Sequence, residues 1–267
     1  MKLKLTMVAL AAMAAMSTAQ ADGFINGGFE DGNANGWTVG GGYRASVYNN
    51  TYAPLMHPSQ FLPGGSLYNS TIASTHSAVI NTSYVDPRVG AALGSTVYAG
   101  NYAMRVEDTT TGGYASVLTQ NVSNYTEANI FFAWKAVLLG AHSNYDAATM
   151  LITLTDKTTG TEVIRREYNA ASGGGGVDPR FSVLNNNFYT PQWQIEQLAI
   201  DGSLSGHDFE LSVLAADCQP TGHWGYVYID GFGSVTPPAG VPEPASLALV
   251  GLALAGAAGA RRRAKKA

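Results

Sequence analysis

Cysteine is nearly absent from this sequence, because Cys218 is the only one among 267 residues. One thiol cannot form an internal disulfide framework or a metal site built from several cysteines. Charged residues are also scarce, at 13% of the chain, about half the roughly 25% of an ordinary soluble domain. Glycine, by contrast, is abundant, with 31 residues. This composition excludes a coiled coil, a highly charged disordered chain and a basic nucleic-acid-binding protein.

Positive charge is scarce in the middle of the chain. Seven of the 15 Lys and Arg residues lie within the first four or the last seven positions. Residues 22–240 keep 8 basic and 18 acidic side chains, a net charge of about −10. Such a body repels phosphate backbones, which proteins bind mainly through Lys and Arg. We therefore expect no nucleic-acid partner.

The first 21 residues have the pattern of a secretory signal peptide. Lys2 and Lys4 give a positive start, and a helical apolar run follows over residues 5–16. Ala19 and Ala21 then supply the small residues of a cleavage site. The alternative, an amphipathic first helix of the fold, fits less well because almost nothing polar interrupts the apolar run. We predict export and removal of this segment by signal peptidase.

The other end of the chain combines two prolines around a glutamate, an apolar run and a basic tail. The residues that carry this pattern are Pro242, Glu243, Pro244, Arg261, Arg262 and Arg263. The prolines keep the triplet extended and accessible. The sixteen small or apolar residues at 245–260 would span about 24 Å as a helix, short of the roughly 30 Å hydrocarbon core. The positive-inside rule keeps the basic tail cytoplasmic, so we predict a short, transient transmembrane anchor in the inner membrane.

This arrangement resembles the PEP-CTERM sorting tail of Gram-negative exopolysaccharide producers in order, spacing and terminal position. The resemblance covers residues 241–266. It implies recognition by an exosortase, removal of the tail near the Pro-Glu-Pro triplet, and delivery to the cell surface or extracellular matrix. A plain C-terminal membrane anchor is the alternative. Residues 237–240 are then a linker between the folded body and the sorting signal at 241–267.

Residues 22–236 are predicted to form one all-β domain. Short β-branched and aromatic runs are separated by clusters of Gly, Asn, Asp and Ser, which is a strand-and-turn pattern. Residues 102–107 alternate between the two sides of a strand, and Asp156–Gly160 is typical of a hairpin turn. We expect an antiparallel two-sheet sandwich of the jelly-roll type. The expected strands are 43–48, 102–107, 116–122, 130–139, 150–155, 162–168, 193–200, 209–214 and 226–229, with strand-poor stretches at 49–77 and 170–187.

Two segments resemble the ends of known sandwiches. Phe24–Gly32 looks like the opening strand of carbohydrate-binding modules and galactose-binding-like domains, and Gly225–Phe232 resembles their closing strand. In those families the two strands lie side by side, and a carboxylate from each often helps to hold a structural calcium ion. The resemblance implies that Glu30 and Asp230 are calcium ligands, and the Gly-rich turns beside them leave backbone carbonyls to complete the shell. The alternatives are a loop cap for Glu30 and a turn acceptor for Asp230.

The densest cluster of polar chemistry is the segment 217–226. Cys218 and His223 are zinc-ligand types, yet only one further acid lies near them and a structural zinc site needs four ligands. A nucleophile pair would need an orienting group and an oxyanion site, which a sequence does not display. The simpler interpretation is a buried, apolar Cys218 and a His223 that hydrogen-bonds within its loop. For ligand binding, this segment offers His223, Trp224 and Tyr226.

Aromatic residues gather in the first third of the chain. They are Trp37, Tyr43, Tyr48, Tyr52, Tyr68 and Tyr84. Flat rings pack against the C–H faces of sugars while amides and carboxylates bind the hydroxyls, so such a surface suits polysaccharide. Core packing is the alternative, because strands also favour aromatic residues. We expect Trp37, Trp134 and Trp193 in the core, and Trp224 as the tryptophan most open to solvent.

No enzyme motif is evident in the sequence. It has no nucleophile elbow, zinc-protease helix, P-loop or dinucleotide fingerprint, and adjacent acids alone do not define a glycosidase pair. We predict a non-catalytic surface or matrix protein that binds extracellular polysaccharide and carries structural Ca²⁺ as its one cofactor. The alternatives are a secreted hydrolase of polysaccharides or esters, and a purely structural matrix protein or adhesin.

Overall fold

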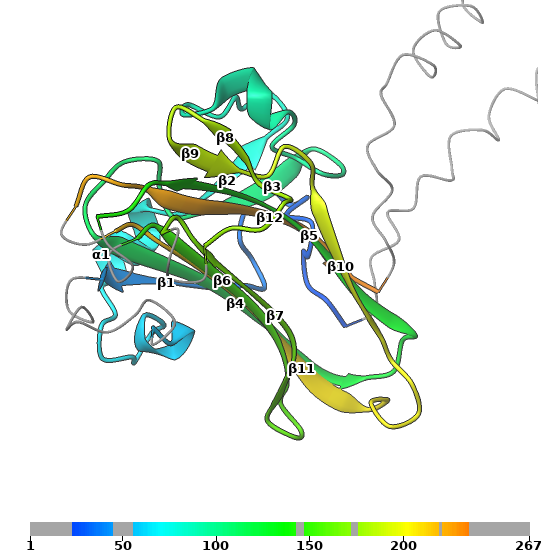
Figure 1. The fold of residues 1–267 in the computed structure, drawn as a ribbon. Helices are drawn as coiled ribbons and strands as arrows, with labels where there is room; N and C mark the ends of the chain where they lie inside the picture. The colour runs from blue at the N-terminus through cyan, green and yellow to red at the C-terminus, as the bar shows by residue number, and fades with distance from the viewer. Residues whose placement is uncertain (1–22, 45–55, 143–146, 172–175, 219–220, 235–267) are drawn as a thin grey trace, which may run out of the picture. The chain divides into compact units, whose positions relative to one another are not determined.

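Two antiparallel sheets lie face to face as two layers in this computed structural model (Figure 1). The structure describes residues 23–44, 56–142, 147–171, 176–218 and 221–234. Sheet A has the order β1 (Thr38–Tyr43), β4 (Tyr114–Tyr125), β11 (His207–Ala216), β6 (Thr149–Asp156) and β7 (Thr161–Asn169). Sheet B has the order β2 (Ala78–Asn81), β3 (Tyr102–Val106), β12 (Gly225–Gly233), β5 (Asn129–Leu139), β9 (Asn187–Tyr189) and β8 (Ser182–Leu184), and β10 (Gln194–Ala199) also pairs with β5. The predicted all-β sandwich is confirmed.

Helices are few and short in the described ranges. They are η3 (Pro58–Gln60), α1 (Ser70–Thr75) and η4 (Gly90–Leu93). In this part of the chain, no helix has the length and apolar character that crossing a membrane requires. The predicted signal helix and the predicted transmembrane helix both lie outside the described residues.

Most successive strands change sheet as the chain proceeds. β3, β5, β10 and β12 lie in sheet B, and β4, β6, β7 and β11 lie in sheet A. Within this series, β6 and β7 stay in one sheet because they form a hairpin. Its turn has Gly160 at φ +73°, and the Gly160 N–H donates to Asp156 O at 2.8 Å. The alternation between sheets joins the two layers of the antiparallel sandwich along the described part of the chain, and the predicted hairpin turn is confirmed.

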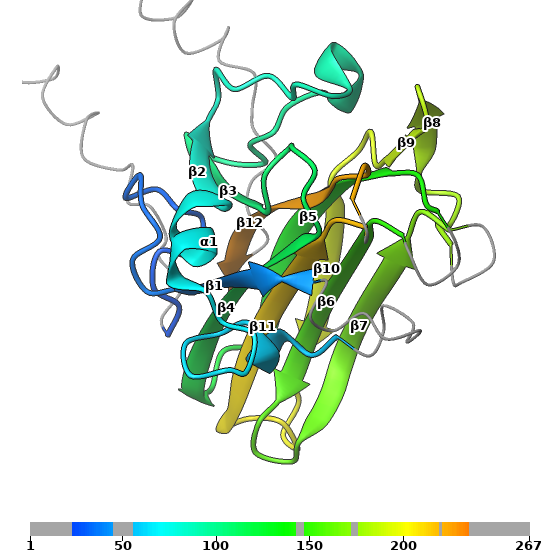
Figure 2. The same ribbon diagram turned by 90° about the vertical axis from the view of Figure 1, so that its left-hand side faces the viewer.

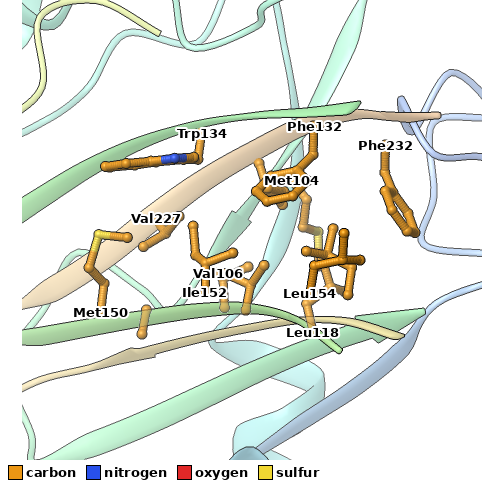
Figure 3. Packing of buried hydrophobic residues seen from close by; sticks show 14 of the residues in the cluster. Met104, Val106, Leu118, Phe132, Trp134, Met150, Ile152, Leu154, Val227 and Phe232 are labelled. Carbon is orange, nitrogen blue, oxygen red and sulfur yellow. The ribbon is translucent and has the colours of Figure 1, made fainter. Parts of the chain in front are cut away.

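The main core fills the space between the two sheets. Leu118 and Ile152 reach inward from sheet A, and Phe132, Trp134 and Val227 reach inward from sheet B (Figure 3). All five side chains are fully buried. Because side chains alternate along a strand, a slip of one residue would turn such an apolar row to the opposite face. The core therefore fixes the register of both sheets, and with it the position of every strand end.

The chain that follows β2 covers the outer face of sheet B. Asp86 in this segment is buried and accepts hydrogen bonds from the hydroxyls of Tyr226 and Tyr228, at 2.9 and 2.7 Å. From β5, the ammonium group of Lys135 donates to two backbone carbonyls of the same segment, at residues 93 and 95. Burial lowers the pKa of Lys135 to about 8. Polar groups of the sheet thus hold the segment in place over it.

Three consecutive glycines in β1, residues 40–42, let the segment 56–75 lie directly on sheet A. A Cβ atom at Gly42 would sit 2.0 Å from the carbonyl oxygen of Leu67. The Gly41 N–H donates to Phe61 O at 2.9 Å, and Figure 2 shows α1 lying beside β1. Glycine weakens a strand but allows another backbone to approach closely. The run of glycines is therefore explained by this contact.

The structure corrects the expected opening strand. Residues 24–32 form turns rather than a strand. The segment still lies beside the last strand, because the Phe232 N–H donates to Gly27 O at 3.0 Å and the rings of Phe24 and Phe232 are 4.2 Å apart. A left-handed backbone at Asn26 and Phe29 prevents regular strand geometry here. Side-by-side placement is thus found, without strand pairing.

Other expectations differ in detail. Of the strand expected at 43–48, only Tyr43 lies in a strand, as the last residue of β1. Arg44 follows that strand, and residues 45–48 are outside the described residues. Sequence patterns also missed the short strands β2, β8 and β9. Trp37 and Trp134 are in the core as predicted, whereas Trp193 is half-buried in a second cluster on the outer face of sheet B.

We expect Gly42→Ala to destabilise the domain, because the new methyl group would collide with the backbone of the segment 56–75. The loss should be about 1–3 kcal/mol or more, as for other overpacked sites. Gly202→Ala is the matched control, since no atom lies within 4 Å of a Cβ placed there. Urea unfolding of both variants measures the difference. Equal stability of the two variants would contradict this account of β1.

Candidate functional site

Strands β1, β3, β4 and β11 bring polar residues together where they begin or end. Beyond β1, the buried Arg44 guanidinium donates to the backbone carbonyls of Ala147 and Asp217. The Asp217 carboxylate accepts the N–H groups of Gly225 at 3.2 Å and Tyr114 at 3.5 Å. Burial, and then the nearby Glu107, raise the pKa of Asp217 well above its usual range. Buried polar groups with backbone partners are therefore gathered at this end of the sandwich.

One group of side chains here, the His76 cluster, consists of His76, Glu107 and Asp108. Glu107 Oε1 lies 2.6 Å from His76 Nδ1, and Asp108 Oδ2 lies 3.5 Å from the same nitrogen. The hydrogen bond to Glu107 raises the pKa of His76, and burial raises the pKa of Glu107. Glu107 Oε2 is buried and makes no hydrogen bond of normal geometry to a described group.

The sequence does not predict the His76 cluster, because the backbone at Glu107 adopts a left-handed conformation. Alternation along residues 102–107 assigns Glu107 to the same side of the strand as Arg105. The chain instead turns at Glu107, which has φ +68°, and the carboxylate becomes fully buried. This left-handed conformation costs a non-glycine residue about 1–2 kcal/mol. The tertiary contacts of the carboxylate offset this cost, and no sequence signal reports it.

Two neighbouring tyrosines connect this cluster to solvent. The Tyr114 ring lies 4.3 Å from the His76 ring and 5.2 Å from the Tyr43 ring, between centroids. Tyr43 is 47% exposed, and Tyr68 beside the same strand is 36% exposed. We call Tyr43 and Tyr114 the tyrosine surface. Of the aromatic residues gathered early in the sequence, Tyr48 and Tyr52 lie outside the described residues.

A second group, the thiol cluster, consists of His142, Cys218 and His223. Cys218 Sγ lies 3.0 Å from His223 Nδ1 and 3.4 Å from His142 Nδ1. The predicted burial of Cys218 is confirmed. Burial, and then the neighbouring His142, lower the pKa of His223. His142 was not predicted as a partner, because it is 76 positions away from Cys218 in the sequence and only the folding of the sandwich brings it there.

The other residues proposed for ligand binding are less open than expected. Trp224 is half-buried: the Arg88 guanidinium lies 3.6 Å from its ring centroid, and its indole N–H donates to Asn187 at 2.9 Å. Tyr226 is fully buried beneath the segment that carries Asp86. In this structure the Tyr226 ring therefore offers no surface to a sugar.

Glu30 and Asp230, the predicted calcium ligands, both bind the loop 98–102. Glu30 accepts the N–H groups of Asn101 and Tyr102 at 3.0 Å, and Asp230 Oδ2 accepts those of residues 98 and 99 at 2.9 and 3.1 Å. Both side chains lie near Gly28, where a Cβ would be 3.5 Å from Asp230 Oδ1 and 3.8 Å from Glu30 Cγ.

Asp230 is left with an uncompensated oxygen. Its Oδ1 is buried and makes no hydrogen bond of normal geometry to a described group. Burial raises the pKa of Asp230 to about 8, and the nearby Glu30 adds to the effect. A bound cation would compensate this charge, and oxygen donors are what Ca²⁺ prefers. Asp230 Oδ1 is therefore an oxygen donor of the kind that calcium binds, and calcium at this pair stays a prediction.

The predicted sorting residues lie outside the described residues. A comparison with protein families covers those at the C-terminal end. Residues 240–263 match the PEP-CTERM protein-sorting motif. The motif indicates export and a membrane-associated sorting signal. No curated protein matches the chain.

Several solved sandwich structures are similar to this chain. TmCBM61 in complex with β-1,4-galactotriose is 13% identical with a TM-score of 0.39, and the match covers 79% of this chain and 96% of that one. A carbohydrate-binding module specific for non-crystalline cellulose, CBM28, is 13% identical with a TM-score of 0.38, covering 80% and 95%. The K1 cleaved adhesin domain of Lys-gingipain from Porphyromonas gingivalis is 10% identical with a TM-score of 0.28, covering 76% and 92%.

Proposed function

We propose that the protein is exported, cleaved by an exosortase near Pro242, Glu243 and Pro244, and delivered to the cell surface or the extracellular matrix. The observation that carries this proposal is the sorting motif at residues 240–263. The signal-peptide pattern that ends at Ala19 and Ala21 supports export. The basic tail retains the chain in the inner membrane until cleavage.

The sandwich of the delivered protein binds extracellular polysaccharide through the tyrosine surface. Tyr43 supports this role because its ring is 47% exposed and rests against Tyr114. A ring held in this way offers a flat apolar face without further loss of side-chain freedom on binding. Asp108, which is 22% exposed, lies 3.5 Å from His76, whose ring contacts Tyr114, and it provides an acceptor for sugar hydroxyls.

Binding without catalysis suits this arrangement better than hydrolysis. A glycosidase needs two carboxyl groups that flank the scissile bond of a bound substrate. Glu107 and Asp217 have the raised pKa values of general acids, yet both are fully buried. Asp108 is the more accessible carboxylate of this group. A secreted hydrolase remains the second candidate, and a structural matrix protein or adhesin the third.

Calcium has a structural role in this proposal. Glu30 and Asp230 would hold the ion beside the loop 98–102, and backbone carbonyls would complete its oxygen shell. When bound, the ion supplies the positive charge that the buried Asp230 carboxylate lacks. Glu30 and Asp230 would thus join the opening segment of the domain to its last strand.

The sorting proposal predicts two cuts in the native product. Intact mass and C-terminal sequencing of the protein from the producing cell should show loss of the first 21 residues and of the chain after about residue 242. Replacing Arg261, Arg262 and Arg263 with Gln should impair this processing, because the topology signal is lost. An uncut full-length chain in the cytosol, or normal processing of the triple variant, would contradict the proposal.

The binding proposal predicts that Tyr43→Ala weakens binding to the exopolysaccharide of the producing organism by about tenfold or more. Burying one aromatic side chain contributes about 1.5–3 kcal/mol, and 1.4 kcal/mol corresponds to a factor of ten. Ile195→Ala is the matched control, since Ile195 is 46% exposed on β10. Isothermal titration calorimetry with soluble exopolysaccharide measures the difference.

Three results of this experiment would count against polysaccharide binding at the tyrosine surface. Equal affinity of the two variants would exclude Tyr43 from the site. Shortening of the polysaccharide, abolished by Asp108→Asn, would favour the hydrolase. Self-association of the chain without any glycan binding would favour the structural protein.

The calcium proposal predicts that the stability of the folded domain depends on pH through Asp230, and that bound calcium alters this dependence. In the folded protein the pKa of Asp230 is about 8, against 3.8 for an unperturbed aspartate, so between these values the folded state holds a proton that the unfolded state has lost. With a chelator present, the protonated Asp230 carboxyl stabilises the folded state at low pH, and this stabilisation is lost as the pH rises through 8. Added Ca²⁺ should raise Tm at pH 8 by at least about 2–4 °C, the shift for 1 kcal/mol in a domain of this size.

Asp230→Asn should remove both the calcium response and this part of the pH dependence. Asp31→Asn, a change at an exposed carboxylate of the same segment, should keep both. Glu30→Ala should lower Tm in both conditions, because it removes the acceptor of the Asn101 and Tyr102 N–H groups, and should lower it more in calcium than in chelator. Thermal unfolding followed by circular dichroism provides the measurement, and equal losses of Tm in calcium and in chelator would contradict a calcium site.

A further inference from the structure

We propose that His142, Cys218 and His223 bind a zinc ion. One donor atom of each residue, an imidazole nitrogen of each histidine and the sulfur, lies within 4.8 Å of the other two. They come from two loops, one after β5 and one between β11 and β12, that lie together at the end of the sandwich. A thiol and two imidazoles form a donor set that suits zinc and excludes calcium, which prefers oxygen.

The spacing of the donors is close to what the ion requires. With Zn–S near 2.3 Å and Zn–N near 2.0–2.1 Å, tetrahedral geometry places sulfur and nitrogen about 3.6 Å apart. The two sulfur–nitrogen distances in the thiol cluster are 3.0 and 3.4 Å. Outward movements of about 0.6 and 0.2 Å would therefore bring the two sulfur–nitrogen distances to the value that zinc requires.

The surrounding backbone holds the donors in this arrangement. The Cys218 N–H donates to His223 O at 3.0 Å and closes the loop that carries both ligands. Gly140 leaves room for the His223 ring, since a Cβ there would sit 3.2 Å from it, and Gly222 lies beside the His142 ring. Both glycines have positive φ, at +46° and +111°. Each loop thus contributes a histidine and packs a glycine beside the histidine of the other loop.

The burial of the three ligands indicates the kind of site. Cys218 is fully buried, His223 is half-buried and His142 is exposed. The ion would consequently sit below the surface with its fourth position open to water, as zinc sites with three protein ligands do. Coordination also keeps a thiolate from oxidation in an oxidising compartment. This site is independent of the proposed calcium pair and of the tyrosine surface.

Metal replacement tests this proposal directly. The purified full-length chain should take up one Co²⁺ per molecule and show the near-ultraviolet charge-transfer band of a thiolate–cobalt bond. Zinc should displace the cobalt, and an equal concentration of Ca²⁺ should not. Competition with a chromophoric chelator then gives the zinc affinity, and mass spectrometry gives the stoichiometry.

Three variants make the result specific. Cys218→Ser should abolish the charge-transfer band, and His142→Ala should weaken zinc binding at least about tenfold, the minimum expected from the loss of even an indirect ligand contact. His142 is exposed, so its removal leaves the core intact and keeps the test valid even where Cys218→Ser does not fold. His57→Ala, at an exposed histidine outside the cluster, should bind zinc normally. Absence of the thiolate band in the unmodified chain, or equal zinc affinity of the His142 and His57 variants, would overturn the proposal.

Discussion

The contact between the inner faces of the two sheets determines where every candidate site residue lies. Leu118 and Ile152 of sheet A meet Phe132 and Val227 of sheet B in a fully buried layer. The strands that carry them lead directly into the polar clusters, because Asp217 follows β11 immediately and His142 lies three positions after β5. A change of strand register would therefore move core and cluster residues together. The stability of the core and the geometry of the clusters cannot be separated.

The sequence predicts those parts of the fold that depend on local alternation. The expected strands at 130–139 and 150–155 correspond closely to β5 and β6, and the Asp156–Gly160 turn is found. Alternation fails where a tertiary contact overrides it, as at Glu107, whose left-handed backbone turns the carboxylate into the interior. It also gives no information on β8 and β9, which are three residues long and too short for a period to be visible.

For the candidate site, the sequence predicts residue types better than it predicts partners. It singles out Cys218 and His223, which are five positions apart, and misses His142, which the topology of the sandwich brings from a distant loop. It also treats Tyr226 as a surface residue, although Asp86 binds its hydroxyl under a covering segment. Such errors share one cause: contacts between residues that are remote in sequence leave no periodic signal, whereas a turn or an amphipathic strand does.

Both outer faces of the sandwich are covered in part by chain, and this restricts where a ligand can reach the protein. The segment after β2 lies on Tyr228 and Lys135 of sheet B, and the segment 56–75 lies on the glycines of β1. A sugar ring cannot reach aromatic side chains beneath such a cover. The exposed ring of Tyr43 lies at the end of a strand instead, where the covering segment does not hide it. The ends of strands, rather than the centre of a sheet face, are thus where this sandwich presents its chemistry.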